Sequence, residues 1–151
     1  MATDAAPALP QTERVTPELK PQQLSFPLPR ALHTTGHVHL TFLDHCIMAF
    51  LTTSTPGDSA GTVKPLGSFV YAMPDRASSN STIATTIYTS ASSIEYTTRV
   101  AKIVARRTKK PVYVGCSIDP NAHGMSVEEE MEGLRKIVEV IVEKYEAQQK
   151  Q

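Results

Sequence analysis

The chain has 151 residues, with 15 lysine or arginine and 15 aspartate or glutamate side chains, so its formal net charge is zero. This length fits one domain with a modest core. The balanced charge excludes an overall electrostatic attraction of the chain to nucleic acid or anionic membrane. No apolar run approaches the ~20 residues needed to cross a bilayer, and no basic and apolar leader opens the sequence, so we expect a cytoplasmic protein.

The first 30 residues are rich in proline. Six prolines lie among polar residues and alanine: Pro7, Pro10, Pro17, Pro21, Pro27 and Pro29. Such a composition cannot bury enough apolar surface to order itself, so the sequence predicts a proline-rich flexible tail over residues 1–35 and a folded domain over residues 36–148. Leu24, Phe26 and Leu28 alternate within the tail and are compatible with an extended edge or a partner-binding segment. Disorder is the interpretation that the composition favours.

The folded domain is expected to begin with a β-hairpin. Val38, Leu40 and Phe42 alternate with polar residues, which predicts a strand with one solvated face. Residues 46–53 form a more continuous apolar run, so they are expected to lie more centrally in the sheet, joined to the first strand by a tight turn. Further strands are expected over residues 66–73, 82–89 and 112–117, with a polar loop over residues 54–65.

Two helices are predicted in the second half of the chain. The first begins at Ser92, whose spacing to Glu95 fits a capping box, and ends before Pro111. The second begins at Ser126 with the same spacing to Glu129, and its apolar band is so broad that we expect a second chain to cover part of it. The order of elements predicts an α+β fold, a mainly antiparallel β-sheet flanked by two α-helices.

Three patterns suggest catalytic or metal chemistry, and each has a simpler interpretation. The stretch 57–61, GDSAG, resembles the nucleophile stretch of trypsin-like serine proteases, but alanine replaces its second glycine and the chain is too short for their double barrel. His37 and His39 share a strand face without a third metal ligand at a recognisable spacing. Cys46 and Cys116 form no metal or disulfide motif, and Cys116 is expected to point into the core. The sequence therefore predicts no enzyme, no cofactor and no metal site.

The most distinctive chemistry lies on the first predicted helix, whose outer surface carries six cations and one acid. The predicted partner-binding residues are Arg99, Lys102, Arg106, Arg107 and Lys110. The first three are spaced along one side of the helix, and we expect the set to bind an acidic protein surface. An ordinary solvated helix face explains the charges equally well. Nucleic-acid binding is the weaker alternative, since the net charge is zero and only Tyr96 and Tyr113 supply nearby aromatic rings.

The stretch 100–115, VAKIVARRTKKPVYVG, resembles the proteasome assembly chaperone 4 family. Members of that family carry a similar helix ending in A-R-[RK]-T-x-K, followed by a V-[YF]-V strand. Residues 38–51 and 66–73 are similar to the family's first strands. The resemblance spans roughly residues 36–145, and it leaves out the proline-rich tail and the loop over residues 54–65.

The resemblance implies a role without catalysis or cofactor. It implies a heterodimer with a proteasome assembly chaperone 3-like protein. It further implies that the pair promotes assembly of the α-ring of the 20S proteasome, contacts the proteasome α subunits and α5 above all, and leaves before maturation. Such a protein would reside in the cytoplasm and also in the nucleus. The alternative is a small nucleic-acid-binding or general protein-interaction module that uses the basic helix 92–110.

Overall fold

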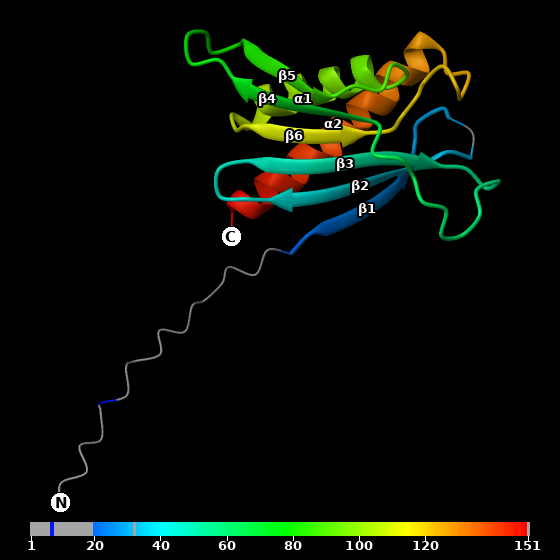
Figure 1. Cartoon of the computed structure of the whole chain (residues 1–151), viewed down its shortest axis with the longest axis horizontal. Helices are drawn as coiled ribbons and strands as arrows, with labels where there is room; N and C mark the ends of the chain where they lie inside the picture. Colours follow the sequence, from blue (N-terminus) through cyan, green and yellow to red (C-terminus); the bar gives the residue numbers. More distant parts are fainter. Residues whose placement is uncertain (1–6, 8–19, 32, 151) are drawn as a thin grey trace, which may run out of the picture.

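The computed structural model describes residue 7, residues 20–31 and residues 33–150. Residues 1–6 and 8–19 of the predicted tail lie outside the described residues. In the described part of the chain, six strands form one sheet, against which two helices pack (Figure 1). The elements in chain order are β1 (Gln22–Pro27), β2 (Thr35–Phe42), β3 (Ile47–Ser54), β4 (Ser68–Pro74), β5 (Thr82–Tyr88), α1 (Ile94–Thr108), β6 (Val112–Cys116) and α2 (Val127–Gln149). This architecture confirms the predicted α+β fold.

The sheet is antiparallel except at its centre. Its strand order is β1-β2-β3-β6-β4-β5, in which β3 and β6 pair in parallel and every other pair is antiparallel. Parallel neighbours need a crossover connection, and the chain between β3 and β6 supplies one that contains α1. As a result β6 lies in the middle of the sheet, while β1 and β5 form its two edges.

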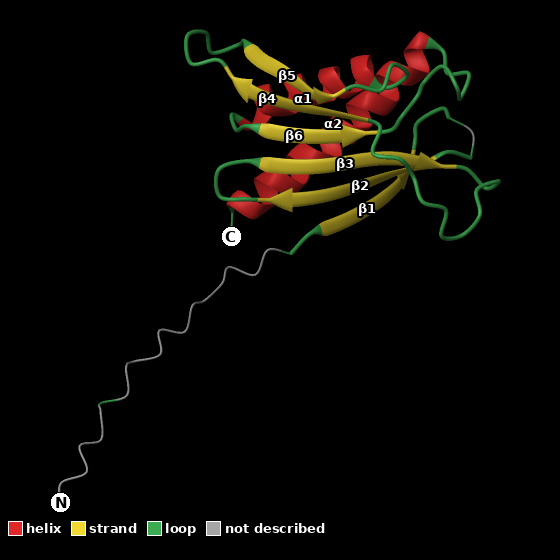
Figure 2. Ribbon diagram, in the orientation of Figure 1, coloured by secondary structure: helices red, strands yellow, loops and turns green. Residues whose placement is uncertain are grey.

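Both helices lie on the same face of the sheet, which we call the covered face (Figure 2). Helix α1 packs on β4, β5 and β6, and α2 packs on β2 and along α1. Branched aliphatic and alanine side chains of the strands fill the space beneath them because alternate residues of a strand point to one face. Their exposed fractions lie between 0% and 3%: Val38, Leu40, Ile47, Ala49, Leu51, Val70, Ala72, Val112 and Val114.

Strand β1 lies within the predicted flexible tail and contradicts part of that prediction. Residues 22–27 pair antiparallel with β2, and Leu24 and Phe26 pack against the core. The following Leu28 is buried, with its backbone N–H donating to Thr34 O at 3.0 Å. The prediction of disorder is therefore wrong for residues 22–28. Apolar side chains at alternate positions supply the buried surface that the proline-rich average conceals.

The two helix starts differ in how they are capped. Ser126 and Glu129 form the predicted capping box at α2, with Ser126 N donating to Glu129 Oε2 at 2.9 Å. The predicted box at Ser92 is wrong, because α1 is preceded by Ser93 and no side chain caps it. The Ser93 hydroxyl instead bonds to the Ser68 hydroxyl at 2.9 Å, which ties the helix start to β4.

The broad apolar band of α2 is covered within the chain itself. Its buried side chains are Leu134, Ile137, Val138, Ile141 and Val142. Because α2 packs on the sheet at β2 and alongside α1, two sides of the helix are covered at once. The expectation that a second chain covers this band is therefore wrong. Large apolar side chains on α2 are exposed at its start, at Val127 and Met131.

Candidate partner-binding surfaces

The face of the sheet opposite the helices, which we call the open face, carries large half-buried side chains. They alternate along each strand with the residues of the covered face: His37 and His39 on β2, Met48 and Phe50 on β3, Phe69, Tyr71 and Met73 on β4, and Tyr113 on β6. Both helices lie on the other side of the sheet (Figure 2). The open face is therefore an apolar surface that the described part of the chain leaves largely uncovered.

The rings on the open face contact one another in a continuous row. Neighbouring ring centroids are 6.3 Å apart between His39 and Phe50, and 6.2 Å apart between Phe50 and Phe69. The row continues from Phe69 to Tyr113 at 6.0 Å and from Tyr113 to Tyr71 at 4.7 Å. Aromatic side chains bury large areas at low entropic cost, which makes such a row suited to partner contact.

Gly115 makes the centre of this row possible. It lies on β6 between Phe50 of β3 and Phe69 of β4. A Cβ atom at this position would lie 2.7 Å from both Phe50 Cδ1 and Leu66 Cδ1. The absence of a side chain therefore lets the two phenylalanine rings approach across β6, and it lets Leu66 rest beside them.

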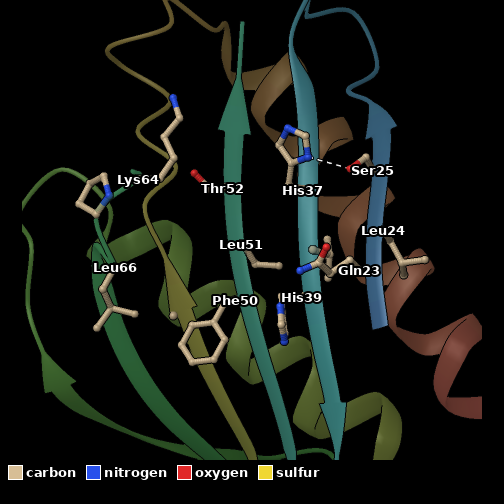
Figure 3. A pocket seen from close by; sticks show the side chains of 13 residues that line it. Gln23, Leu24, Ser25, His37, His39, Phe50, Leu51, Thr52, Lys64 and Leu66 are labelled. Carbon is tan, nitrogen blue, oxygen red and sulfur yellow. Dashed lines mark hydrogen bonds between the residues drawn. The ribbon is translucent and has the colours of Figure 1, made fainter. Parts of the chain in front are cut away.

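A hollow of about 480 Å³ opens on this face between β1, β2, β3 and the loop before β4. Figure 3 shows its wall, with His37 beside Ser25, and Phe50 and His39 at the centre of the view. The His37 ring bonds to Ser25 Oγ at 2.7 Å and to Ser54 Oγ at 2.6 Å. Both ring nitrogens are thus engaged in joining β1, β2 and β3. Among the described residues no group of three His, Cys, Asp or Glu side chains could hold a metal ion.

The stretch 57–61 forms a surface loop between β3 and β4. Its Asp58 accepts hydrogen bonds from Lys64 Nζ at 2.8 Å and from Thr55 N at 2.9 Å. The hydrogen bond from Lys64 has the largest effect, and together with the bond from Thr55 it lowers the pKa of the Asp58 carboxyl. The carboxylate therefore fixes the fold of the loop, which is the role that the turn-rich composition indicated.

The two thiols are poor nucleophiles at neutral pH. Burial raises the pKa of Cys116 to about 11, and burial also raises the pKa of Cys46. The thiolate is the reactive form of cysteine, so neither side chain is activated. Cys116 points into the core as its alternation with Val112 and Val114 predicted.

The structure divides the predicted partner-binding residues into two groups. Arg99, Lys102, Arg106 and Arg107 are exposed on the outer side of α1, and we call them the basic helix face. Lys110 does not belong to this face, because its Nζ donates to Asp44 O at 3.3 Å and lies 5.7 Å from the ring centroid of Tyr145. The sequence could not make this division, since Lys110 follows the end of the helix.

Among the described residues, Arg99 is the one member of the basic helix face with an acid within ion-pair distance. Its Nη1 lies 3.3 Å from Glu130 Oε1 at the start of α2. In the described part of the chain, no acid lies within ion-pair distance of Lys102, Arg106 or Arg107. These three cations are therefore free to meet an external acid.

The sequence did not reveal the open face, and it predicted β5 as a strand without indicating that this strand lies at an edge of the sheet. Strand β5 pairs with β4 alone and exposes about half or more of Ile83, Ile87 and Tyr88. The signal for the open face was present in β3, where Met48 and Phe50 stand between core residues and make both faces of the strand apolar. No described helix is long and apolar enough to span a membrane.

Two comparisons with known proteins, with family models and with solved structures, agree with each other. The family model described as proteasome assembly chaperone 4 matches residues 35–118, more than half of the chain. Seven solved chains match the fold. One of them comes from a structure described as the crystal structure of a novel chaperone complex for yeast 20S proteasome assembly. It has a TM-score of 0.59 and 18% sequence identity, and the match covers 82% of this chain and 94% of that one. No curated protein matches the chain in sequence. From the match of the family model, we conclude that the chain belongs to the proteasome assembly chaperone 4 family.

Proposed function

We propose that this protein pairs with a proteasome assembly chaperone 3-like protein, and that the pair promotes assembly of the α-ring of the 20S proteasome. Membership of the family supports the assembly role, and the solved neighbour is itself part of a chaperone complex. In this proposal the pair acts in the cytoplasm and nucleus, contacts the α subunits and α5 above all, and leaves before the proteasome matures. The role needs neither catalysis nor a cofactor.

The observation that carries the pairing is the open face. Its aromatic row crosses four neighbouring strands, from His39 on β2 to Tyr71 on β4. A continuous apolar patch of this kind on a soluble chain marks an interaction surface. A second sheet complements it well, because two sheets pack face to face ~10 Å apart with their side chains interdigitated. We therefore propose that the companion chaperone covers the open face with a sheet of its own.

A charge placed in the aromatic row tests this pairing. In the complex the carboxylate of Phe50→Asp would be buried without a partner, which costs several kcal/mol. Co-expression with the companion followed by co-purification should recover the pair for the wild type and lose it for Phe50→Asp. Tyr71→Glu gives a second disruption at the far end of the row. Met131→Asp, at an exposed apolar position on α2, is the matched control and should pair as the wild type does.

The outcomes separate pairing from folding. Each variant is first compared with the wild type by circular dichroism and thermal unfolding in isolation, since a half-buried site loses less stability than a core site. Normal pairing by folded Phe50→Asp and Tyr71→Glu would exclude the open face as the pairing surface. Failure of the wild type to capture any 20S α subunit, with the companion present, would contradict the assembly role itself.

A further inference from the structure

The basic helix face and the open face lie on opposite sides of the molecule. Helix α1 packs on the covered face of the sheet (Figure 1). The four cations are exposed on the outer side of this helix. A companion that covers the open face therefore leaves these side chains in solvent. The helical layer is then the surface that the pair presents to a third protein.

We propose that the basic helix face, Arg99, Lys102, Arg106 and Arg107, is the surface with which the pair docks on an acidic patch of a proteasome α subunit. This inference rests on the proposed function, and it assigns the chemistry of the contact with the client. The contact is formed by charge-assisted hydrogen bonds between guanidinium or ammonium groups and carboxylates. It leaves the open face to the companion chaperone.

The arrangement of charges along α1 is unfavourable for the isolated helix. Lys102 and Arg106 stand at i and i+4, where like charges destabilise a helix by roughly 0.2–0.5 kcal/mol. The helix dipole accounts for Arg106 and Arg107, which lie in the last turn. It does not account for Lys102, whereas Arg99 pairs with Glu130. An acidic partner outside the chain would turn this repulsion into attraction.

Helix α2 provides the comparison within the same layer. Its exposed side alternates the two signs, with the cations Arg135, Lys136 and Lys144 among the acids Glu128, Glu139, Glu143 and Glu146. Glu128 and Glu132 also pair with Arg30, at 3.6 Å and 3.2 Å. This mixture is what a merely solvated helix face looks like. The four exposed cations of α1, against the one exposed acid Glu95, therefore set that helix apart.

The surroundings of the basic helix face favour acidic protein over nucleic acid. The two aromatic rings near it in sequence are not available to stack on bases from this surface. Tyr96 is buried, and Tyr113 lies on the open face on the other side of the sheet. The acids of α2 lie alongside and would repel an extended polyanion. A local carboxylate patch on a folded protein meets no such penalty.

Charge reversal tests the docking surface with the assembled pair. The variant Lys102→Glu/Arg106→Glu/Arg107→Glu changes three cations that have no charged neighbour within ion-pair distance among the described residues. The matched control, Arg135→Glu/Lys136→Glu/Lys144→Glu, reverses the same number of exposed cations on α2. Association rates of each pair with each purified 20S α subunit are measured by biolayer interferometry at 50 mM and 200 mM salt.

We expect the α1 variant to associate about ten-fold more slowly than the wild type at low salt, with a weaker salt dependence. The control should stay within about two-fold of the wild type, because its charges lie outside the contact. Thermal unfolding of both variants checks the fold, since exposed charge changes cost little stability. A second variant, Lys102→Gln/Arg106→Gln, removes charge without adding acid and should show a smaller decrease.

Three results would overturn the proposal, and each has a different meaning. If the wild-type pair binds an α subunit and the folded α1 variant binds it at the same rate, the docking surface lies elsewhere and the assembly role stands. If the wild-type pair binds no α subunit, the proposed function fails and this inference fails with it. If a 20-nucleotide single strand binds the wild type tightly, and the charge reversal abolishes this binding but leaves α-subunit binding unchanged, the basic helix face is a nucleic-acid-binding surface.

Discussion

The two faces of the sheet are built from the same strands and differ in the kind of side chain that they carry. The covered face is filled by valine, leucine, isoleucine and alanine, whereas the open face carries phenylalanine, tyrosine, methionine and histidine. Branched aliphatic side chains pack at high density beneath helices, which suits a permanent core. Aromatic rings with polar atoms at their edge tolerate water before a partner arrives and bury large areas afterwards. The difference indicates that one face holds the fold together and the other holds a partner.

Of the changes that test the two faces, removal of β1 is expected to lower the free energy of unfolding most. Leu24, Phe26 and Leu28 all pack against the covered core, whereas Gln23 and Ser25 line the hollow on the open face. Deletion of residues 1–34 should lower the free energy of unfolding by about 4 kcal/mol, from the loss of buried apolar surface.

Urea unfolding of the truncated chain measures this loss. The matched control begins at residue 20 and retains every described strand, so it should lose less than about 1 kcal/mol, as for changes outside the core. An equal midpoint for the deletion of residues 1–34 and for this control would mean that β1 adds nothing to the core.

A paired truncation tests the two faces directly. Leu40→Ala on the covered face should lower the free energy of unfolding by about 3 kcal/mol, because Leu40 is fully buried and its removal leaves a cavity. Met48→Ala removes a side chain of similar size from the open face and should cost about 1 kcal/mol in the isolated chain, since the site is half-exposed. Thermal or urea unfolding of both variants measures the difference. Equal losses would show that both faces are equally important to the fold.

The buried thiol gives the smallest of these effects at ordinary pH. The folded pKa of Cys116 is raised to about 11, so folding favours the protonated thiol. Its contribution is fully present below the unfolded pKa and is lost as the pH rises from about 9 to about 11. The loss approaches about 3 kcal/mol at the upper end, from a shift of about two units.

Unfolding of the wild type and of Cys116→Ala between pH 8 and pH 11 isolates the contribution of Cys116 from that of every other group. The difference in the free energy of unfolding between the wild type and Cys116→Ala should narrow or reverse as the pH rises. A constant difference would mean that Cys116 is accessible to solvent. At pH 8, Cys46 should react with a thiol reagent faster than Cys116, because Cys116 is the more deeply buried of the two.

Local patterns in the sequence determined most of the elements. Alternation predicted β2 and β6, and a more continuous apolar run predicted β3. Strands were also expected where β4 and β5 lie, and apolar spacing predicted α1 and α2. The spacing of Ser126 and Glu129 predicted the cap at α2 because that cap is formed by residues three apart. The sequence also supplied the resemblance to the chaperone family, which the family model confirms.

The tertiary structure decided which of these surfaces are buried. In β3 both faces are apolar, so the alternation of Met48 and Phe50 with Ala49 and Leu51 does not reveal where the helices will pack. Burial of Leu28 inside a proline-rich stretch depends on the neighbouring β2 and on α2, which lies at the other end of the chain. Lys110 lies outside the basic helix face because its side chain contacts Asp44 and Tyr145. Periodicity states which residues share a face, and only the packing of distant segments decides which face is left for a partner.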